Sequence, residues 1–163
     1  MDIEFIKRLV CEFRQALEIV VDKKLYGRLL IFNNFPKECC RYTSDLLATY
    51  LMNVSISRER IQLLESTSYK EEYTHCWLMI DEKLFIDITA DQFNGKSYFK
   101  MYEPIPACCI VLRDTYLYEC FNRRKTHYLR NVGIDNYVGD VTMKLKVVYD
   151  ETIKQIEKLN KER

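Results

Sequence analysis

Apolar residues recur every three or four positions in the first part of the chain. Between residues 2 and 24 these positions are Ile3, Ile6, Leu9, Val10, Phe13, Leu17, Val20 and Val21. This interval is the period of a helix with one buried face, so the pattern predicts a helix over 2–24. The pattern stops near Gly27, and a second helix is predicted over 37–53, with Pro36 near its first turn.

Residues typical of strands dominate the middle of the chain. Ile, Leu, Thr, Tyr, Phe and Trp are enriched there, and Asp81-Glu82 marks a tight turn. The predicted strands are 60–68, 73–80, 83–89 and 108–112. A short helix over 115–124 and a closing helix over 141–160 complete the chain. This order of elements predicts an α+β fold, with the N-terminal helices packed on a mostly antiparallel β-sheet.

Length and composition fit a single domain over residues 1–163. With 48% hydrophobic and 30% charged residues, the chain is expected to fold rather than to stay disordered. No apolar run approaches the roughly 18 residues of a membrane span, and the N-terminus lacks the apolar stretch of a signal peptide. A net charge of +1 with interleaved signs creates no field that would attract nucleic acid or a membrane. We therefore expect a cytoplasmic protein with neither as a partner, and the oligomeric state stays unknown.

The seven cysteines include two adjacent pairs but no CxxC spacing, which is the spacing typical of zinc sites and redox motifs. We interpret them as reduced thiols. Cys76 and His75 are neighbours in a predicted strand, so their side chains point to opposite faces and do not suit a shared zinc ion. No metal and no cofactor are expected.

Three residues suggest nucleophilic catalysis. Cys40 lies at the start of the second predicted helix, where free N–H groups and the helix dipole favour a thiolate. His75, one of only two histidines, lies in a strand and is the better candidate for a base. Asp87 lies in an otherwise apolar strand, where a buried carboxylate needs a partner. Because an imidazole base needs a carboxylate to orient it, the three residues form a candidate catalytic triad.

The triad sets a condition on the hairpin between the two strands that carry His75 and Asp87. A three-residue turn at 81–83 places Trp77 opposite Asp87, and His75 then lies diagonal to Asp87 on the same face of the sheet. A two-residue turn would put the two side chains on opposite faces. The catalytic interpretation therefore predicts the three-residue turn.

Two positions of the triad stay open. Cys39 is an alternative nucleophile, because adjacent residues at a helix start point about 100° apart and the sequence does not show which one faces His75. Asp91 is an alternative to Asp87 as the orienting carboxylate. Both alternatives keep the same chemistry and change only the residue that performs it.

The order of these residues resembles the transglutaminase-like branch of the papain-like cysteine enzymes. Cys40, His-Cys-Trp at 75–77 and Asp-Ile-Thr at 87–89 are similar to the Cys, His-Ala-Trp and Asp-Pro-Thr signatures of that branch. The resemblance implies a helix that begins at the nucleophile and packs on a sheet. It also implies that Cys40 is the nucleophile, that His75 is the general base and acid, and that Asp87 orients the imidazole.

The resemblance covers about residues 30–95 and includes departures from the signatures. Cys76 replaces a small residue, Ile88 replaces a proline, and a second cysteine precedes the nucleophile. A further likeness is Asn34, six residues before Cys40, where papain-like enzymes often keep an amide that donates to the oxyanion. An Asn before a proline-led helix is equally a turn residue, so both interpretations of Asn34 stay open.

Together these residues predict a cysteine-dependent hydrolase that acts on an amide bond through an acyl-enzyme, as a peptidase or a glutamine deamidase. A protein or peptide substrate is expected. One alternative is an acyl or amide transferase of the same fold, in which an amine resolves the intermediate. A second alternative is a non-catalytic binding module in a bacterial or phage conflict system.

Overall fold

Three α-helices lie in the part of the chain that the structure describes. A computed structural model describes residues 2–68, 73–112, 120–121 and 126–162. The helices are α1 (Ile3–Asp22), α2 (Cys40–Val54) and α4 (Asp140–Lys161). The carboxylate of Asp2 caps α1 by accepting a hydrogen bond from the backbone N–H of Phe5 at 3.1 Å. The predicted first and closing helices are thereby confirmed to within two residues at each end.

The strands form one antiparallel sheet. They are β1 (Ile61–Thr67), β2 (Thr74–Ile80), β3 (Leu84–Asp87), β4 (Cys109–Leu112) and β5 (His127–Leu129). Neighbours pair in the order β4-β3-β2-β1-β5, and each of these pairs is antiparallel. The four strands predicted from the sequence are present, and β5 is an addition. The fold is therefore mixed α+β, with an N-terminal helix and a five-stranded antiparallel sheet.

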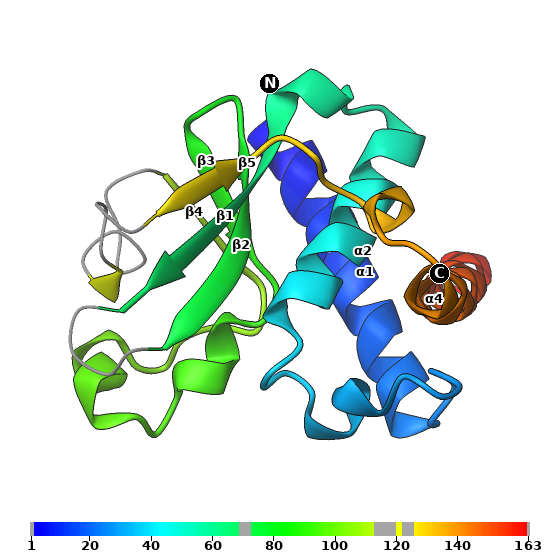
Figure 1. Ribbon diagram of the computed structural model, residues 1–163, viewed down its shortest axis with the longest axis horizontal. Coiled ribbons are helices and arrows are strands. Elements are labelled where there is room, and N and C mark those ends of the chain that lie inside the picture. The colour runs from blue at the N-terminus through cyan, green and yellow to red at the C-terminus, as the bar shows by residue number, and fades with distance from the viewer. Residues whose placement is uncertain (1, 69–72, 113–119, 122–125, 163) are drawn as a thin grey trace.

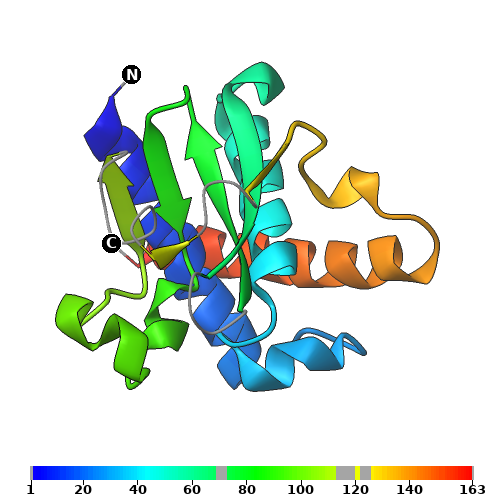
Figure 2. The same cartoon turned by 60° about the vertical axis from the view of Figure 1, so that its left-hand side comes forward.

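The two faces of the sheet are covered by different layers. Figures 1 and 2 show α1 and α2 against one face, with α4 on the outer side of these helices. Along β2, Cys76 and Leu78 belong to the core beneath the helices, whereas Trp77 and Met79 belong to a second core on the other face. The second core is rich in phenylalanine and includes Phe85, Phe93, Phe99 and Phe121. Because both of its faces are covered, β2 has a nearly continuous apolar sequence.

The hairpin between β2 and β3 fixes the faces on which the candidate residues lie. Its paired residues are Leu78 with Ile86, Met79 with Phe85, and Ile80 with Leu84. Residues 81–83 are therefore a three-residue turn, in which Asp81 and Glu82 take left-handed φ angles of 52° and 57°. The predicted register is confirmed. Since side chains alternate along a strand, His75 and Asp87 lie on the same face of the sheet.

The start of the second helix differs from the prediction. The helix α2 begins at Cys40 and not at residue 37, because Glu38 takes a left-handed φ of 64° that interrupts a helical path. Pro36 therefore lies in the loop before the helix. The predicted helix over 115–124 lies outside the described residues, apart from residues 120 and 121.

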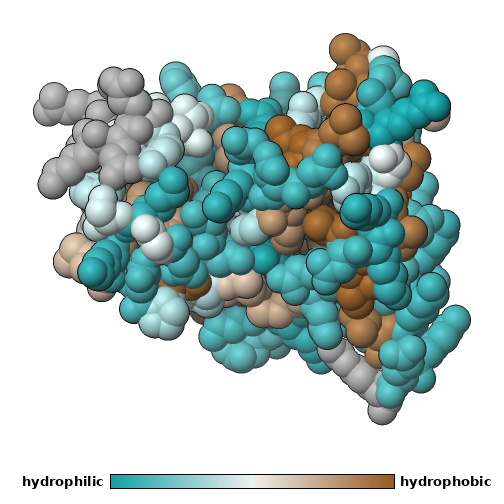
Figure 3. Space-filling view, turned by 90° about the horizontal axis from the view of Figure 1, so that it is seen from below, coloured by the Kyte–Doolittle hydropathy of each residue, from teal (hydrophilic) through white to brown (hydrophobic). Residues whose placement is uncertain are grey.

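The outer helix leaves apolar side chains on the surface. Met143 and Val147 of α4 are exposed, as is Val138 just before it. Figure 3 shows apolar surface along the side of the molecule where α4 lies, next to hydrophilic side chains. Among the residues that the structure describes, no helix has both the length and the apolar character required to cross a membrane.

Candidate active site

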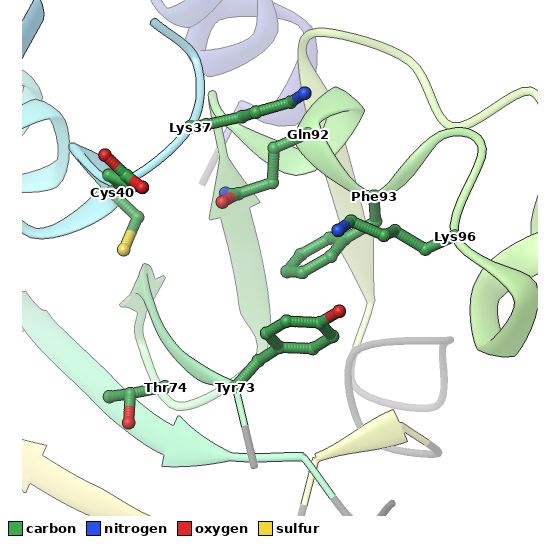
Figure 4. Close-up of a pocket in the computed structure, with 8 residues that line it drawn as sticks. Lys37, Cys40, Tyr73, Thr74, Gln92, Phe93 and Lys96 are labelled. Atoms are coloured by element: carbon green, nitrogen blue, oxygen red, sulfur yellow. The ribbon is translucent and has the colours of Figure 1, made fainter. Parts of the chain in front are cut away.

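Cys40 is the first residue of α2 and borders a pocket of about 300 Å³. No side chain caps the start of this helix, so the N–H groups of its first turn and the helix dipole favour a negative charge there. Figure 4 shows the Cys40 sulfur facing the pocket, with Gln92 and Tyr73 across it. The lining residues are Lys37, Glu38, Cys40, Tyr73, Thr74, Gln92, Phe93 and Lys96.

Cys39, the alternative nucleophile, lies in the protein interior. Its exposed fraction is 0%, and burial raises the pKa of its thiol to about 12. A thiol with this pKa stays protonated at neutral pH and is a poor nucleophile. Of the two adjacent cysteines, the structure therefore places Cys40 at the pocket.

His75 and Asp87 form a buried pair. Nε2 of His75 lies 2.6 Å from Oδ2 of Asp87, and both side chains are 1% exposed. The second carboxylate oxygen, Oδ1, accepts hydrogen bonds from the backbone N–H and the hydroxyl of Thr89, at 2.8 and 3.0 Å. The edge of the imidazole meets the Phe93 ring, with the two ring centres 4.8 Å apart. These contacts fix the imidazole and leave Nδ1 as the ring nitrogen available to Cys40.

The charges of the site favour a thiolate next to an imidazolium. Burial acts to lower the pKa of His75, but the charge and hydrogen bond of Asp87, together with the contact to Cys40, raise this pKa to about 10. The pKa of Cys40 is lowered to about 4, first by a hydrogen bond from Cys76 and then, against the effect of burial, by the hydrogen bond and charge of His75. Both shifts favour an ion pair of thiolate and imidazolium at this site. A thiolate in this setting is nucleophilic at neutral pH.

Cys76 contacts Cys40 from β2, a role that the sequence did not indicate. The interaction with Cys40 and burial raise the pKa of Cys76, so Cys76 keeps its proton. The Cys76 thiol donates to Oε2 of Glu65 at 3.6 Å, and the backbone C=O of Cys76 accepts from the Ser44 hydroxyl at 3.4 Å. The sequence carried one hint of this role, because Cys76 replaces the small residue of the His-Ala-Trp signature.

Gln92 is a second residue that the sequence analysis missed. It belongs to the 3₁₀ helix η3 (Ala90–Phe93), and its Nε2 donates to the backbone C=O of Thr89 at 2.8 Å. The same nitrogen lies 3.4 Å from Nδ1 of His75. Figure 4 shows the Gln92 amide directed toward the side of the pocket where Cys40 lies. The only hint in the sequence was that Gln92 follows the Asp-Ile-Thr segment by three residues, which keeps it close to Asp87.

Asp91, the alternative carboxylate, is paired with Arg14 of α1. Its two oxygens lie 3.0 and 2.9 Å from Nη1 and Nη2 of Arg14. Arg14 is buried and also donates to the backbone C=O groups of Ile88 and Ala107. The structure therefore brings Asp87 to His75 and uses Asp91 to hold the segment after β3 against α1.

Asn34 lies away from the pocket lining. It ends the 3₁₀ helix η1 (Leu30–Asn34), is exposed, and donates from Nδ2 to Oε2 of Glu38 at 2.9 Å. This contact is that of a loop residue, so Asn34 is not positioned to donate to an oxyanion next to Cys40. Of the two interpretations that the sequence left open, the structure favours the turn residue.

The described residues do not form a metal-binding cluster. His127 lies exposed in β5, which pairs with β1. Within residues 2–68, 73–112, 120–121 and 126–162, no three His, Cys, Asp or Glu side chains are grouped as a metal site requires.

Comparison with known proteins adds no relative to this description. No protein-family model, no curated protein and no solved structure matches the chain. The geometry around Cys40 is therefore the basis on which a function is assigned.

Proposed function

We propose that this protein is a cysteine-dependent hydrolase that acts on an amide bond, as a peptidase or a glutamine deamidase. The observation that carries the proposal is the chain of contacts from Cys40 through His75 to Asp87, at the edge of an open pocket. An activated thiol, an acid–base imidazole and an orienting carboxylate are the parts that such catalysis needs. The resemblance to transglutaminase-like and papain-like enzymes supports the same roles.

In the first step, the Cys40 thiolate attacks the carbonyl carbon of the substrate and forms a C–S bond. The imidazolium of His75 then gives its Nδ1 proton to the leaving amine or ammonia, and the C–N bond breaks. The product of this step is a thioester between the acyl group and Cys40. Asp87 holds the ring through Nε2 in this step.

In the second step, water attacks the thioester carbonyl. Neutral His75 accepts a proton from the water at Nδ1, and the Cys40 thiolate leaves as the C–S bond breaks. The acyl group departs as a carboxylic acid, and the ion pair is restored. Hydrolysis and transfer differ only at this step, because a primary amine in place of water gives an amide product.

Gln92 is the proposed side-chain donor to the oxyanion that forms in both steps. Nε2 of its amide donates to the Thr89 C=O and lies 3.4 Å from Nδ1 of His75, at the border of the pocket next to Cys40. The free N–H groups at the start of α2 are the proposed second source of hydrogen bonds. Donors of this kind lower the barrier because they are already oriented where negative charge develops.

A thiolate nucleophile persists in a reducing compartment, so the cytoplasm is the proposed location. The proposed substrates are proteins or peptides, because the pocket is open to solvent at the protein surface and the family resemblance points to amides. Neither nucleic acid nor a membrane is required by the proposed chemistry.

The test is a peptide-library digestion followed by mass spectrometry. Peptidase activity gives new chain ends, and deamidase activity converts glutamine to glutamate with release of ammonia. Addition of a primary amine tests the transferase alternative, which predicts incorporation of the amine into the product. The Cys40→Ala variant should be inactive in every arm. Equal product in wild type and Cys40→Ala would rule out the mechanism and favour the binding module.

A further inference from the structure

Two lysines border the pocket that contains Cys40. Lys37 lies in the loop before α2, and Lys96 lies between η3 and the 3₁₀ helix η4 (Ser97–Tyr102). In the described part of the chain, neither ammonium group is paired with a carboxylate. A charged group that is unpaired at the mouth of a pocket attracts ligands of the opposite sign.

The position of Lys96 is set by an aromatic ring. Its Nζ lies 5.3 Å from the centre of the Tyr73 ring, which is a cation–π distance. Figure 4 shows Lys96 beside the rings of Phe93 and Tyr73, while Lys37 lies on the side of Gln92. The two lysines therefore border the pocket on different sides, and the rings of Phe93 and Tyr73 next to Lys96 offer an apolar wall.

One acidic side chain, Glu38, belongs to the described lining of the same pocket. Its carboxylate accepts a hydrogen bond from Asn34 Nδ2 at 2.9 Å, which directs it toward the loop before α2. Deeper in the site, the negative charges of Cys40 and Asp87 oppose the positive charge of His75, so the site as a whole carries no excess charge. The positive charge that an anion would meet is therefore local to Lys37 and Lys96 at the mouth of the pocket.

We propose that Lys37 and Lys96 form an anion subsite, so that the preferred substrate carries a carboxylate or another negative group near the carbonyl that Cys40 attacks. The chemical class is an acidic peptide, or a small amide with a carboxylate on its acyl side. This inference rests on the proposed hydrolase and narrows its substrate. The lysines position the substrate by charge and take no part in bond making.

The test compares two alkylating reagents that differ in charge and needs no substrate. Iodoacetate is an anion and iodoacetamide is neutral, and both place a similar group on the Cys40 sulfur. The ratio of their rate constants at Cys40, iodoacetate over iodoacetamide, should fall roughly tenfold in the double variant Lys37→Gln/Lys96→Gln. Added salt should reduce the difference between wild type and variant. The matched control is Lys100→Gln, since Lys100 is an exposed lysine of η4 outside the pocket lining.

The two reagents separate failure of the subsite from failure of the hydrolase. A ratio that is the same in wild type and double variant overturns the subsite, whatever the rates are. A Cys40 that does not react with iodoacetamide in wild type overturns the nucleophile itself. The iodoacetamide rate also reports whether the variant keeps its fold and thiolate. If that rate changes in the double variant, the single variants Lys37→Gln and Lys96→Gln are tested by the same ratio.

A separate observation concerns two cysteines where α1 meets the start of β4. Cys11 of α1 is exposed, and Cys108 lies directly before β4. Their sulfur atoms are 2.7 Å apart, although the two residues are 97 positions apart in the sequence. A disulfide brings two sulfurs to about 2.05 Å, so a small movement would allow the bond to form.

We infer that Cys11 and Cys108 are a reversible disulfide pair. A peroxide would supply the oxidising equivalents: the two thiols lose two electrons and two protons, the S–S bond forms, and the peroxide O–O bond is reduced to two waters. The bond would join α1 to the strand whose Cys109 pairs with Asp87. Oxidation would thus tie the helix layer to the strand beside the candidate triad.

The test is peptide mapping under non-reducing conditions after treatment with dilute hydrogen peroxide. A linked Cys11–Cys108 peptide should form and disappear after reduction, and the Tm should rise by several degrees in wild type but not in Cys11→Ser. The control is Cys120→Ser, which removes a buried thiol elsewhere and should keep the linked peptide. Recovery of Cys11 and Cys108 as unlinked peptides after this treatment would overturn the inference.

Discussion

The chemistry of single residues around Cys40 predicts an unusual pH dependence of its reactivity. Its pKa is lowered to about 4 by Cys76 and His75, so the thiolate is present above that pH and is lost as the pH falls through it. An ordinary thiol has a pKa of about 8.5. The rate of alkylation by iodoacetamide, measured at Cys40 by mass spectrometry, should therefore be half-maximal near pH 4. A midpoint between pH 8 and 9 would contradict the ion pair, and buried Cys39 serves as the unreactive control in the same protein.

The three candidate residues should differ in the cost of their removal. Cys40→Ala and His75→Ala should reduce kcat to a residual level, whereas Asp87→Asn should keep a kcat roughly a hundredfold above that level, because it removes only the orienting group. The measurement is kcat on the substrate found by library digestion. The control is Asp135→Asn, an exposed carboxylate at the start of a 3₁₀ helix, which should match wild type. Full activity of the Asp87→Asn variant would show that Asp87 does not orient the imidazole for catalysis.

Gln92 and Asn34 provide a direct contrast between structure and sequence. If Gln92 donates to the oxyanion, Gln92→Ala should lower kcat by about 10²–10³ with little change in KM. Asn34→Ala should leave kcat unchanged, because its amide binds Glu38 in the loop. The opposite pattern, with a loss only in Asn34→Ala, would restore the interpretation that the family resemblance suggested.

Between elements, the triad depends on the attachment of the segment after β3 to α1. Buried Arg14 binds Asp91 and the C=O groups of Ile88 and Ala107. Arg14→Met should lower the free energy of unfolding by about 3–5 kcal/mol, because it leaves these groups without their donor. The measurement is urea denaturation, and the control is Arg8→Met, an exposed residue of the same helix that should change stability by less than about 0.5 kcal/mol. Equal stability of the two variants would contradict this role of Arg14.

The elements were predictable to different degrees. Periodicity predicted α1 and α4, because each has a long face that is buried along its whole length. The register of the β2–β3 hairpin followed from the requirement that His75 and Asp87 share a face. The start of α2 was not predictable, because it depends on the left-handed conformation of Glu38, which side-chain patterns do not indicate. The short strand β5 was missed because its three residues, two exposed and one half-buried, carry no clear alternation.

At the scale of the whole molecule, the sequence pointed to three residues of the candidate site and missed two others that lie next to them. Cys40, His75 and Asp87 were recognisable because each residue type is unusual in its element. Cys76 and Gln92 were not, because their contacts arise only when the start of α2, the start of β2 and η3 meet around one pocket. The choice between Asp87 and Asp91 as the orienting carboxylate depends on Arg14, which pairs with Asp91 and comes from a distant part of the chain.

In the proposed mechanism, Cys40 forms an acyl-enzyme that His75 helps to hydrolyse. This intermediate can be observed with the activated ester p-nitrophenyl acetate, by following nitrophenolate release together with the intact mass of the protein. The mechanism predicts a rapid burst of one nitrophenolate per chain, an acetyl group on Cys40, and slow loss of that group, with no burst in Cys40→Ala and slower loss in His75→Ala. Acetylation of lysines or of Cys11 while Cys40 stays unmodified would contradict it.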